Sequence, residues 1–171
     1  MNRKIIFKYF RHPVIGFKKL MLRCIGIPFS IWLINFIFQR IFRLNSNFPH
    51  SVHFSSRVVG EEKIQIGRNV WKSFALSGNC YIQGGNGIVI GDDTIFAPGV
   101  KIISANHDPK ILNSWVKAPP VQIGKRCWIG ANAVILPGVE LGDEVIVGAG
   151  AVVTRSVPSG VTVVGNPARP I

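Results

Sequence analysis

An apolar residue recurs at every sixth position along the second half of the chain. From residue 123 the sequence reads IGKRCW, IGANAV, ILPGVE, LGDEVI, VGAGAV and VTRSVP, and each block opens with Ile, Leu or Val. This six-residue period fits neither the 3.6-residue period of a helix nor the alternation of a single strand. The fifth position of each block is small or aliphatic, and its occupants are Cys127, Ala133, Val139, Val145, Ala151 and Val157.

The same frame extends upstream and is interrupted once. The blocks IGDDTI, FAPGVK and IISANH begin at residues 90, 96 and 102, and after His107 nine residues, DPKILNSWV, leave the frame before it resumes at Lys117. Further upstream, to residue 48, the opening positions are poorer but the fifth positions stay aliphatic. These are Val52, Val58, Ile64, Val70, Leu76, Ile82 and Ile88.

Such a period predicts short strands joined by tight corners, with three strands in each turn of a triangular column. Opening and fifth side chains should point inward, and Gly at the corners avoids steric collisions. Coils of 18 residues should stack at the usual strand spacing of about 4.8 Å. We therefore expect an all-β, parallel β-helix over residues 46–171, with about six coils and one loop extruded after His107.

The N-terminal quarter differs in composition from the rest of the chain. Residues 1–43 hold nine of the 20 Lys and Arg residues and no acidic residue, and the first carboxylate is Glu61. The segment from Cys24 to Gln39, CIGIPFSIWLINFIFQ, contains no charge. It is shorter than the roughly 20 residues of a spanning helix, Pro28 interrupts it, and no signal-peptide cleavage pattern follows.

We interpret residues 1–45 as a hydrophobic, basic helical segment that lies on an anionic membrane surface. The alternatives are a helix that packs on its own domain or on a partner subunit, and a true membrane span. Nucleic acid is not expected, because no recognition motif accompanies the basic residues. Three widely spaced cysteines favour a reducing compartment over a disulfide framework. A cytoplasmic protein, peripheral on the inner face of a bacterial membrane, is the predicted location.

Two stretches carry a resemblance to a known family. IGDDTIFAPGVKIISANHD and WIGANAVILPGVELGDEVIVGAGAVVTRSVPSGVTVVGNPARPI resemble the left-handed β-helix, hexapeptide-repeat O-acetyltransferases. This family includes galactoside, maltose, serine and surface-polysaccharide (colanic-acid-type) acetyltransferases. The resemblance implies a left-handed helix, acetyl-coenzyme A as co-substrate, no metal, and a homotrimer with active sites where subunits meet.

His107 is the predicted general base. It ends its six-residue block at a corner and should project outward beside the loop, and a neutral imidazole can take a hydroxyl proton near pH 7. Its neighbours Asn106 and Asp108 are candidates for orienting the ring, although a carboxylate at a loop start is as often a turn former. Cys127 occupies an inward position, so we expect a core residue and direct transfer without an acyl-enzyme.

Further site residues follow from the resemblance. Ser77 stands where galactoside-type enzymes have an acceptor-binding Asn. Asn79 is a further candidate for catalysis and acceptor binding, and Trp115 is a further acceptor-binding candidate. Residues at coenzyme A positions have alternative explanations. Small residues avoid steric collisions at corners, the arginines can serve solubility, and the tryptophan can cover the coil surface. Those positions are Trp128, Ala131, Ala149, Thr154, Arg155 and Arg169.

The sequence therefore predicts acetyl-CoA-dependent O-acetylation of a sugar hydroxyl on a lipid-linked precursor of a surface polysaccharide. The alternatives are a non-enzymatic membrane scaffold and transfer to a small non-sugar acceptor. Zinc carbonic anhydrases share this fold, but His50 and His53 should lie about three coils, roughly 14 Å, from His107. That separation is too large for shared metal ligation within one chain.

Overall fold

A computed structural model describes residues 26–171 of the chain. Residues 1–25, with His12, Cys24 and seven of the nine basic residues of the N-terminal quarter, lie outside the described residues. Of the basic, apolar quarter, the structure describes residues 26–43.

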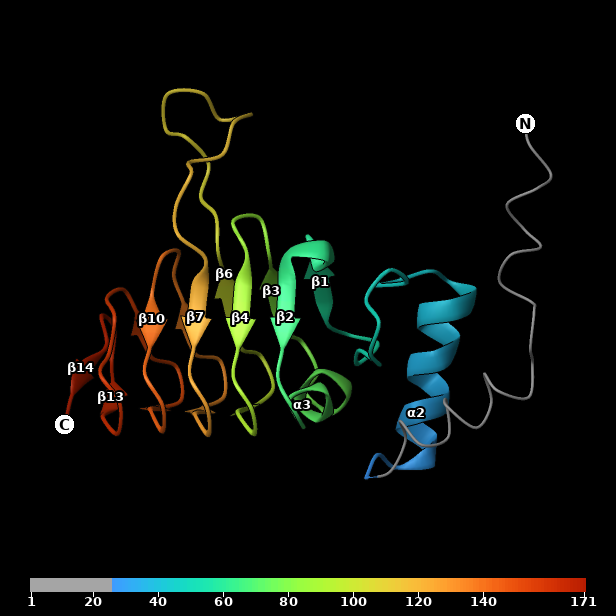
Figure 1. Cartoon of the computed structure of the whole chain (residues 1–171). Helices are drawn as coiled ribbons and strands as arrows, with labels where there is room; N and C mark the ends of the chain where they lie inside the picture. Colours follow the sequence, from blue (N-terminus) through green and yellow to red (C-terminus); the bar gives the residue numbers. More distant parts are fainter. Residues whose placement is uncertain (1–25) are drawn as a thin grey trace.

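The repeat forms a three-faced column of short parallel strands (Figure 1). Face A stacks β1 Arg57–Val59, β3 Tyr81–Gln83, β6 Lys101–Ile103, β9 Val134–Ile135 and β12 Val152–Val153. Face B stacks β2 Ile64–Ile66, β4 Ile88–Ile90, β7 Val121–Ile123 and β10 Glu140–Leu141. Face C stacks β5 Ile95–Phe96, β8 Trp128–Ile129, β11 Ile146–Val147 and β13 Thr162–Val164, with β14 Arg169–Pro170 antiparallel to β13.

The predicted inward positions are confirmed where the repeat is regular. From residue 123 onward, every opening residue and every fifth residue of the six blocks is buried. Ile135 and Ala133, for example, are fully buried, while Trp128, between two inward positions, is half-exposed. A column one strand wide on each face thus obtains its core from two residues in six.

One predicted strand is wrong. Residues 71–76 form the short helix α3 Trp71–Leu76 at the place where face C would have its first strand. Two block-opening positions are poor here, since Lys72 lies within this segment and Gly78 follows it, and a helix takes the place of the strand. Phe74 packs against Phe48 and Phe96, with ring centroids 4.8 and 5.0 Å away. Leu76, predicted to point inward, is therefore exposed.

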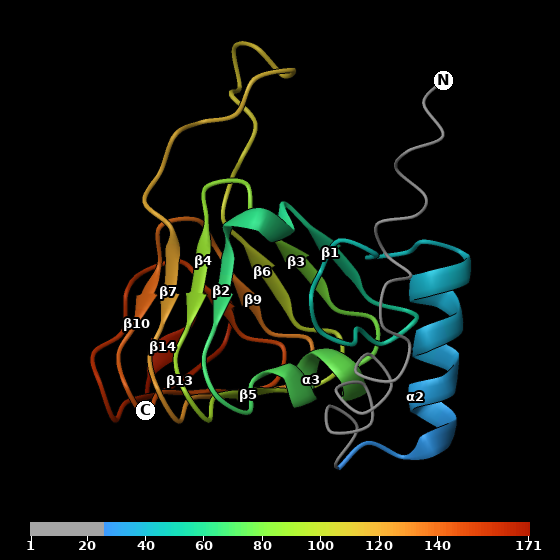
Figure 2. The same cartoon turned by 45° about the vertical axis from the view of Figure 1, so that its right-hand side comes forward.

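The predicted extruded loop leaves the column between β6 and β7 (Figures 1 and 2). A 3₁₀ turn, η3 Glu61–Lys63, makes the corresponding corner of the first coil. Residues 48–56 form no strand, so face A stacks five strands where the sequence predicts about six coils. The left-handed winding stays a prediction from the resemblance.

The apolar N-terminal segment forms a helix that packs on its own domain. Helix α2 Phe29–Phe36 continues into a π-helical turn, η2 Ile37–Ile41, and lies across the end of the column (Figures 1 and 2). Pro28 precedes the first helical residue, a position where its missing N–H costs nothing. Within residues 26–171, no helix combines the length and apolarity that a bilayer span needs.

Candidate active site

The faces meet at three edges, which we name by the faces they join. The A–B edge comprises residues 60–63, 84–87, 104–120 and 136–139. The B–C edge comprises residues 67–70, 91–94, 124–127 and 142–145, and the C–A edge comprises residues 77–80, 97–100, 130–133 and 148–151. The extruded loop belongs to the A–B edge, and His107 lies in its stem.

His107 is exposed, as predicted, and a main-chain carbonyl fixes its ring. Nδ1 lies 2.6 Å from the carbonyl oxygen of Leu112. A carbonyl oxygen can only accept, so Nδ1 of the neutral ring carries the proton and donates it. The lone pair is then on Nε2, where a general base needs it.

The stem of the loop is fastened to the column by Asn86. Its Nδ2 group donates to the carbonyl oxygens of Ser104 and Val116, each at 2.9 Å, and so ties the outgoing strand of the stem to the returning one. Its main-chain N–H donates to Ser104 Oγ at 3.0 Å. His107 and Trp115 then pair across the stem as an isolated antiparallel bridge.

Trp115 packs over the column beside His107. The two ring centroids are 5.7 Å apart, and the planes are inclined by 59°. The indole covers Gly85 so closely that a Cβ at Gly85 would lie 2.1 Å from it. Only glycine therefore permits this position of the ring, which leaves the half-exposed Trp115 as the aromatic surface nearest to the imidazole.

Neither Asn106 nor Asp108, the two predicted orienting neighbours, has a side-chain hydrogen bond to the His107 ring. Asp108 accepts from the Lys110 N–H through Oδ1 at 2.8 Å, so its carboxylate closes a turn within the loop. The main-chain carbonyl of Asn106 accepts a hydrogen bond from the Val116 N–H. Asn106 is exposed to solvent. The structure thus assigns the orienting contact to Leu112, a choice that residue identity could not reveal because the acceptor is backbone.

The two acceptor candidates upstream lie on a different edge. Asn79 is exposed at the C–A edge with a left-handed φ of 58°, and Ser77 is buried there with its hydroxyl donated to the Phe96 carbonyl at 2.7 Å. In one chain, face A separates both residues from His107. Because Ser77 is buried and its hydroxyl already donates to a carbonyl, we do not expect that hydroxyl to contact an acceptor substrate.

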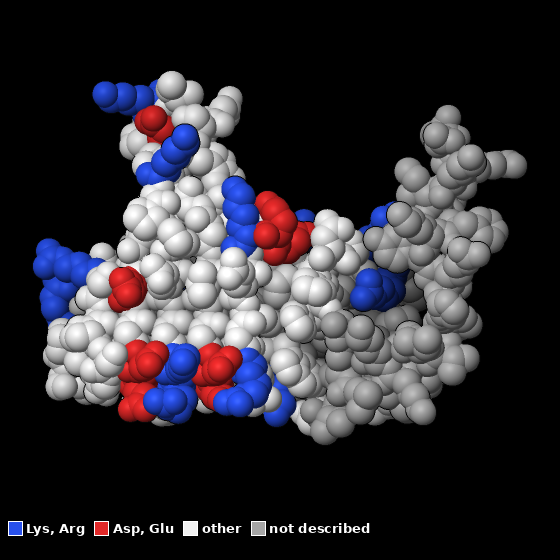
Figure 3. Space-filling view, in the orientation of Figure 1, with Lys and Arg blue, Asp and Glu red and all other residues white. Residues whose placement is uncertain are grey.

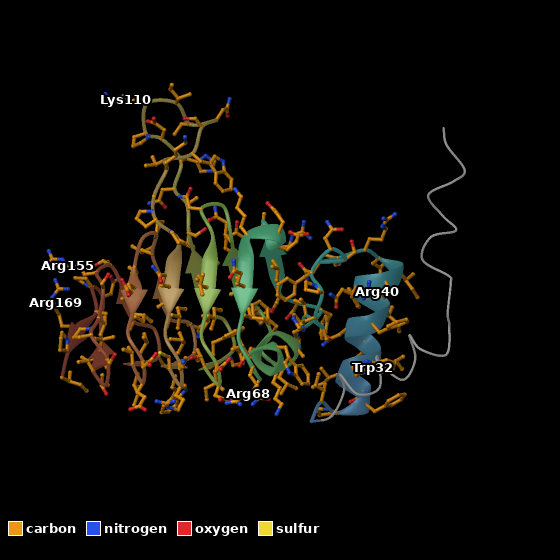
Figure 4. All side chains as sticks on the ribbon, viewed as in Figure 1. Trp32, Arg40, Arg68, Lys110, Arg155 and Arg169 are labelled. Atoms are coloured by element: carbon orange, nitrogen blue, oxygen red, sulfur yellow. The ribbon has the colours of Figure 1, made fainter. Side chains whose placement is uncertain are left out.

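The candidate coenzyme A residues are distributed over the C-terminal coils, from β8 to β14. Ala131 and Ala149 stack at the C–A edge, where the carbonyl of Ala131 accepts from the Gly150 N–H. Trp128 is half-exposed on face C, in register with Ile95 and Ile146. Thr154 is exposed at the end of the A–B edge, and Figure 4 shows Arg155 and Arg169 at the C-terminal end of the column.

Charged side chains gather on the B–C edge and pair with each other. Figure 3 shows acidic and basic residues alternating there. Arg68 pairs with Asp93 at 2.7 Å, and Arg126 pairs with Glu144. The hydrogen bond from Arg68, together with one from Asn69, lowers the pKa of Asp93.

Among the described residues, Cys80, Cys127 and His53 do not form a competing centre. Cys80 and Cys127 are buried, and desolvation raises the pKa of each thiol, so neither resembles an activated nucleophile. Burial lowers the pKa of His53, whose Nδ1 lies 2.9 Å from Ser55 Oγ. Within the described residues 26–171, no group of three His, Cys, Asp or Glu side chains is placed to hold a metal ion.

Comparison with known proteins agrees with the repeat. The family model described as "hexapeptide repeat of succinyl-transferase" matches residues 120–155. These residues span β7 to β12, the regular part of the column. Nodulation protein L of Rhizobium meliloti is 47% identical over 109 residues, which cover 62% of this chain and 57% of that protein.

Two further relatives are named acetyltransferases. The galactoside O-acetyltransferase of Escherichia coli is 36% identical over 111 residues, which cover 63% of this chain and 53% of that enzyme. The crystal structure of a hexapeptide-repeat acetyltransferase from Vibrio cholerae, complexed with acetyl coenzyme A, shares 25% identity at a TM-score of 0.59. That match covers 95% of this chain and 91% of the other. The chain spans little more than half the length of the two sequence relatives.

Proposed function

We propose that this chain is an acetyl-CoA-dependent O-acetyltransferase that modifies a sugar hydroxyl, with His107 as the general base. The observation that carries the proposal is the contact between His107 Nδ1 and the Leu112 carbonyl, which leaves Nε2 free at an exposed position. The likeness to acetyltransferases, one of them named for a galactoside, supports the class of reaction.

The residues of the A–B edge would carry the chemistry. Acetyl-coenzyme A supplies the acyl group as a thioester. His107 accepts the proton of the acceptor hydroxyl on Nε2 while the new C–O bond forms and the C–S bond breaks, and it then returns that proton to the leaving sulfur. Trp115 offers an aromatic surface beside the ring, against which the acceptor can pack.

The residues proposed to hold the co-substrate fit its chemistry. Arg155 and Arg169 are exposed cations at one end of the column and suit nucleotide phosphates. Ala131 and Ala149 lie at an edge whose small side chains leave the main chain open to an extended pantetheine arm. Trp128, half-exposed on face C, adds apolar surface.

A homotrimer would complete the site. His107 and the C–A edge residues lie on different edges of one column, so a second chain must bring them together. Closed three-fold symmetry does this three times with the same contact. The mass of the purified protein in solution checks this part of the proposal. The basic, apolar residues 1–43 would hold the enzyme peripherally at an anionic membrane, close to a lipid-linked acceptor.

The test is acetyl-CoA turnover against free and lipid-linked glycans, with the wild type compared to His107→Ala. Loss of a general base should lower kcat by about 10²–10⁴-fold without changing thermal stability. Asp108→Asn is the matched control, because its carboxylate closes a turn and should affect turnover little. A His107→Ala enzyme that retains activity within a few-fold would refute the assignment. Absence of turnover on every acceptor would favour the scaffold alternative.

A further inference from the structure

Helix α2 and the η2 turn face the column with polar side chains. Asn35 is fully buried, donates to the Ala75 carbonyl at 2.9 Å and accepts from the Phe54 N–H at 3.0 Å. Gln39, also buried, donates to the His50 carbonyl at 2.8 Å and accepts from the Val52 N–H. These amides pair with main-chain groups next to the first coil, which a solenoid otherwise leaves open at its end.

The opposite side of the same segment is apolar and exposed. Phe29, Ile41 and Phe42 are 72%, 67% and 64% exposed, and Leu33 and Ile34 are also exposed. We call these five residues the outer helix surface. A helix that buries two amides and exposes five large apolar side chains is inverted with respect to an ordinary surface helix, so this apolar side is the face that a partner would cover.

Charge selects the kind of partner. Arg40 and Arg43 are exposed beside the outer helix surface, and no carboxylate occurs before Glu61. Apolar side chains with only basic neighbours match the boundary between acyl chains and anionic headgroups. A second copy of the same surface would bring like charges together.

The geometry points to an acceptor hydroxyl held at a fixed height above a membrane that contacts the outer helix surface. This inference rests on the proposed function. Two strand spacings of about 4.8 Å separate β1 from β6, which His107 follows. Helix packing adds about 10 Å and the helix radius about 5 Å. His107 thus lies roughly 25 Å from the acyl-chain boundary.

This height defines the substrate class. A sugar joined directly to a lipid phosphate stays within the headgroup layer and cannot reach His107. The substrate is therefore a lipid-linked oligosaccharide that carries its reactive hydroxyl several sugars from the lipid. Figure 1 shows α2 across one end of the column, so copies related by an axis parallel to the column would present all their helices to one plane.

The first measurement is binding of the full chain to phosphatidylglycerol vesicles and to phosphatidylcholine vesicles. Phe29→Ser/Phe42→Ser should weaken binding to the anionic vesicles by about tenfold or more, because two exposed aromatic side chains no longer enter the membrane. Val89→Ser is the matched control, since Val89 is exposed between Gln65 and Gln122 on face B. Unchanged vesicle binding with a changed oligomer mass would assign the surface to a second copy and overturn the inference.

The second measurement is turnover with acceptors of increasing length between lipid and terminal sugar, embedded in anionic vesicles. Long spacers should be acetylated at least about tenfold faster than short ones, and the Phe29→Ser/Phe42→Ser variant should lose this preference. The same oligosaccharides without lipid report on the proposed function alone. Turnover of the free sugars with no dependence on spacer length would overturn the inference and leave the function standing.

Discussion

The A–B and B–C edges of the column are built from the same repeat and differ in how they use polar residues. On the B–C edge, side chains of successive coils pair with each other, as Arg68 does with Asp93 and Arg126 with Glu144. On the A–B edge, Asn86 binds main-chain carbonyls and fixes a loop that leaves the column. The edge whose charged side chains pair with each other is a structural ladder, and the edge that departs from the repeat holds the candidate base.

This contrast predicts that equal chemical changes have unequal consequences on the two edges. Asn86→Asp should lower kcat by roughly 10–100-fold, because a carboxylate would face the carbonyls of Ser104 and Val116 and release the stem that carries His107. The KM for acetyl-coenzyme A should stay unchanged. Steady-state kinetics with the free glycan acceptor measures both quantities.

Asn69→Asp is the control for that change. Asn69 donates to Asp93 on the B–C edge at 2.6 Å, so the same substitution also creates a repulsive pair there. Turnover of folded Asn69→Asp enzyme should equal that of the wild type. Equal kinetic losses in the two variants would contradict the functional distinction between the edges.

Thr94→Val should act on stability and not on turnover. Thr94 is fully buried, donates to the Gly124 carbonyl at 2.7 Å and accepts from the Cys127 N–H at 2.9 Å. Valine has the same shape but leaves both main-chain groups unpaired, which should cost about 1–3 kcal/mol of unfolding free energy. Chemical denaturation measures the loss, and Thr162→Val on half-exposed face C should remain within about 0.5 kcal/mol of wild type.

The smallest effect is expected at Asp93. Its pKa is lowered in the fold by Arg68 and Asn69, so its contribution to stability is present above the ordinary pKa of about 3.9 and is lost as the pH falls through the lower folded value. Asp93→Asn should therefore melt slightly below wild type at neutral pH, and the difference should vanish in acid. A difference in melting temperature that persists in acid would show that the ion pair is not its cause.

Much of the fold could be predicted because the six-residue period acts locally. Each block places its first and fifth residues inside the column whatever happens elsewhere, and this holds for every block from residue 123. The six-residue period wrongly predicted a strand at α3. There Phe74 packs against Phe48 and Phe96, which are distant from it in sequence. Counting blocks also separates Asn79 from His107: their blocks begin at residues 78 and 102, which are four blocks apart, and three blocks make one turn.

The sequence by itself determined the column, its interior, the place of the loop and the outward position of His107, because each depends on side-chain size at a regular spacing. Only the tertiary structure decided that Leu112 orients the imidazole, that Asn86 fastens the stem, and that α2 turns its amides inward. All three depend on main-chain groups that the folded chain brings to these side chains. Every residue carries the same carbonyl and, proline apart, the same N–H. The sequence of side chains therefore does not indicate which main-chain group a polar side chain will bind.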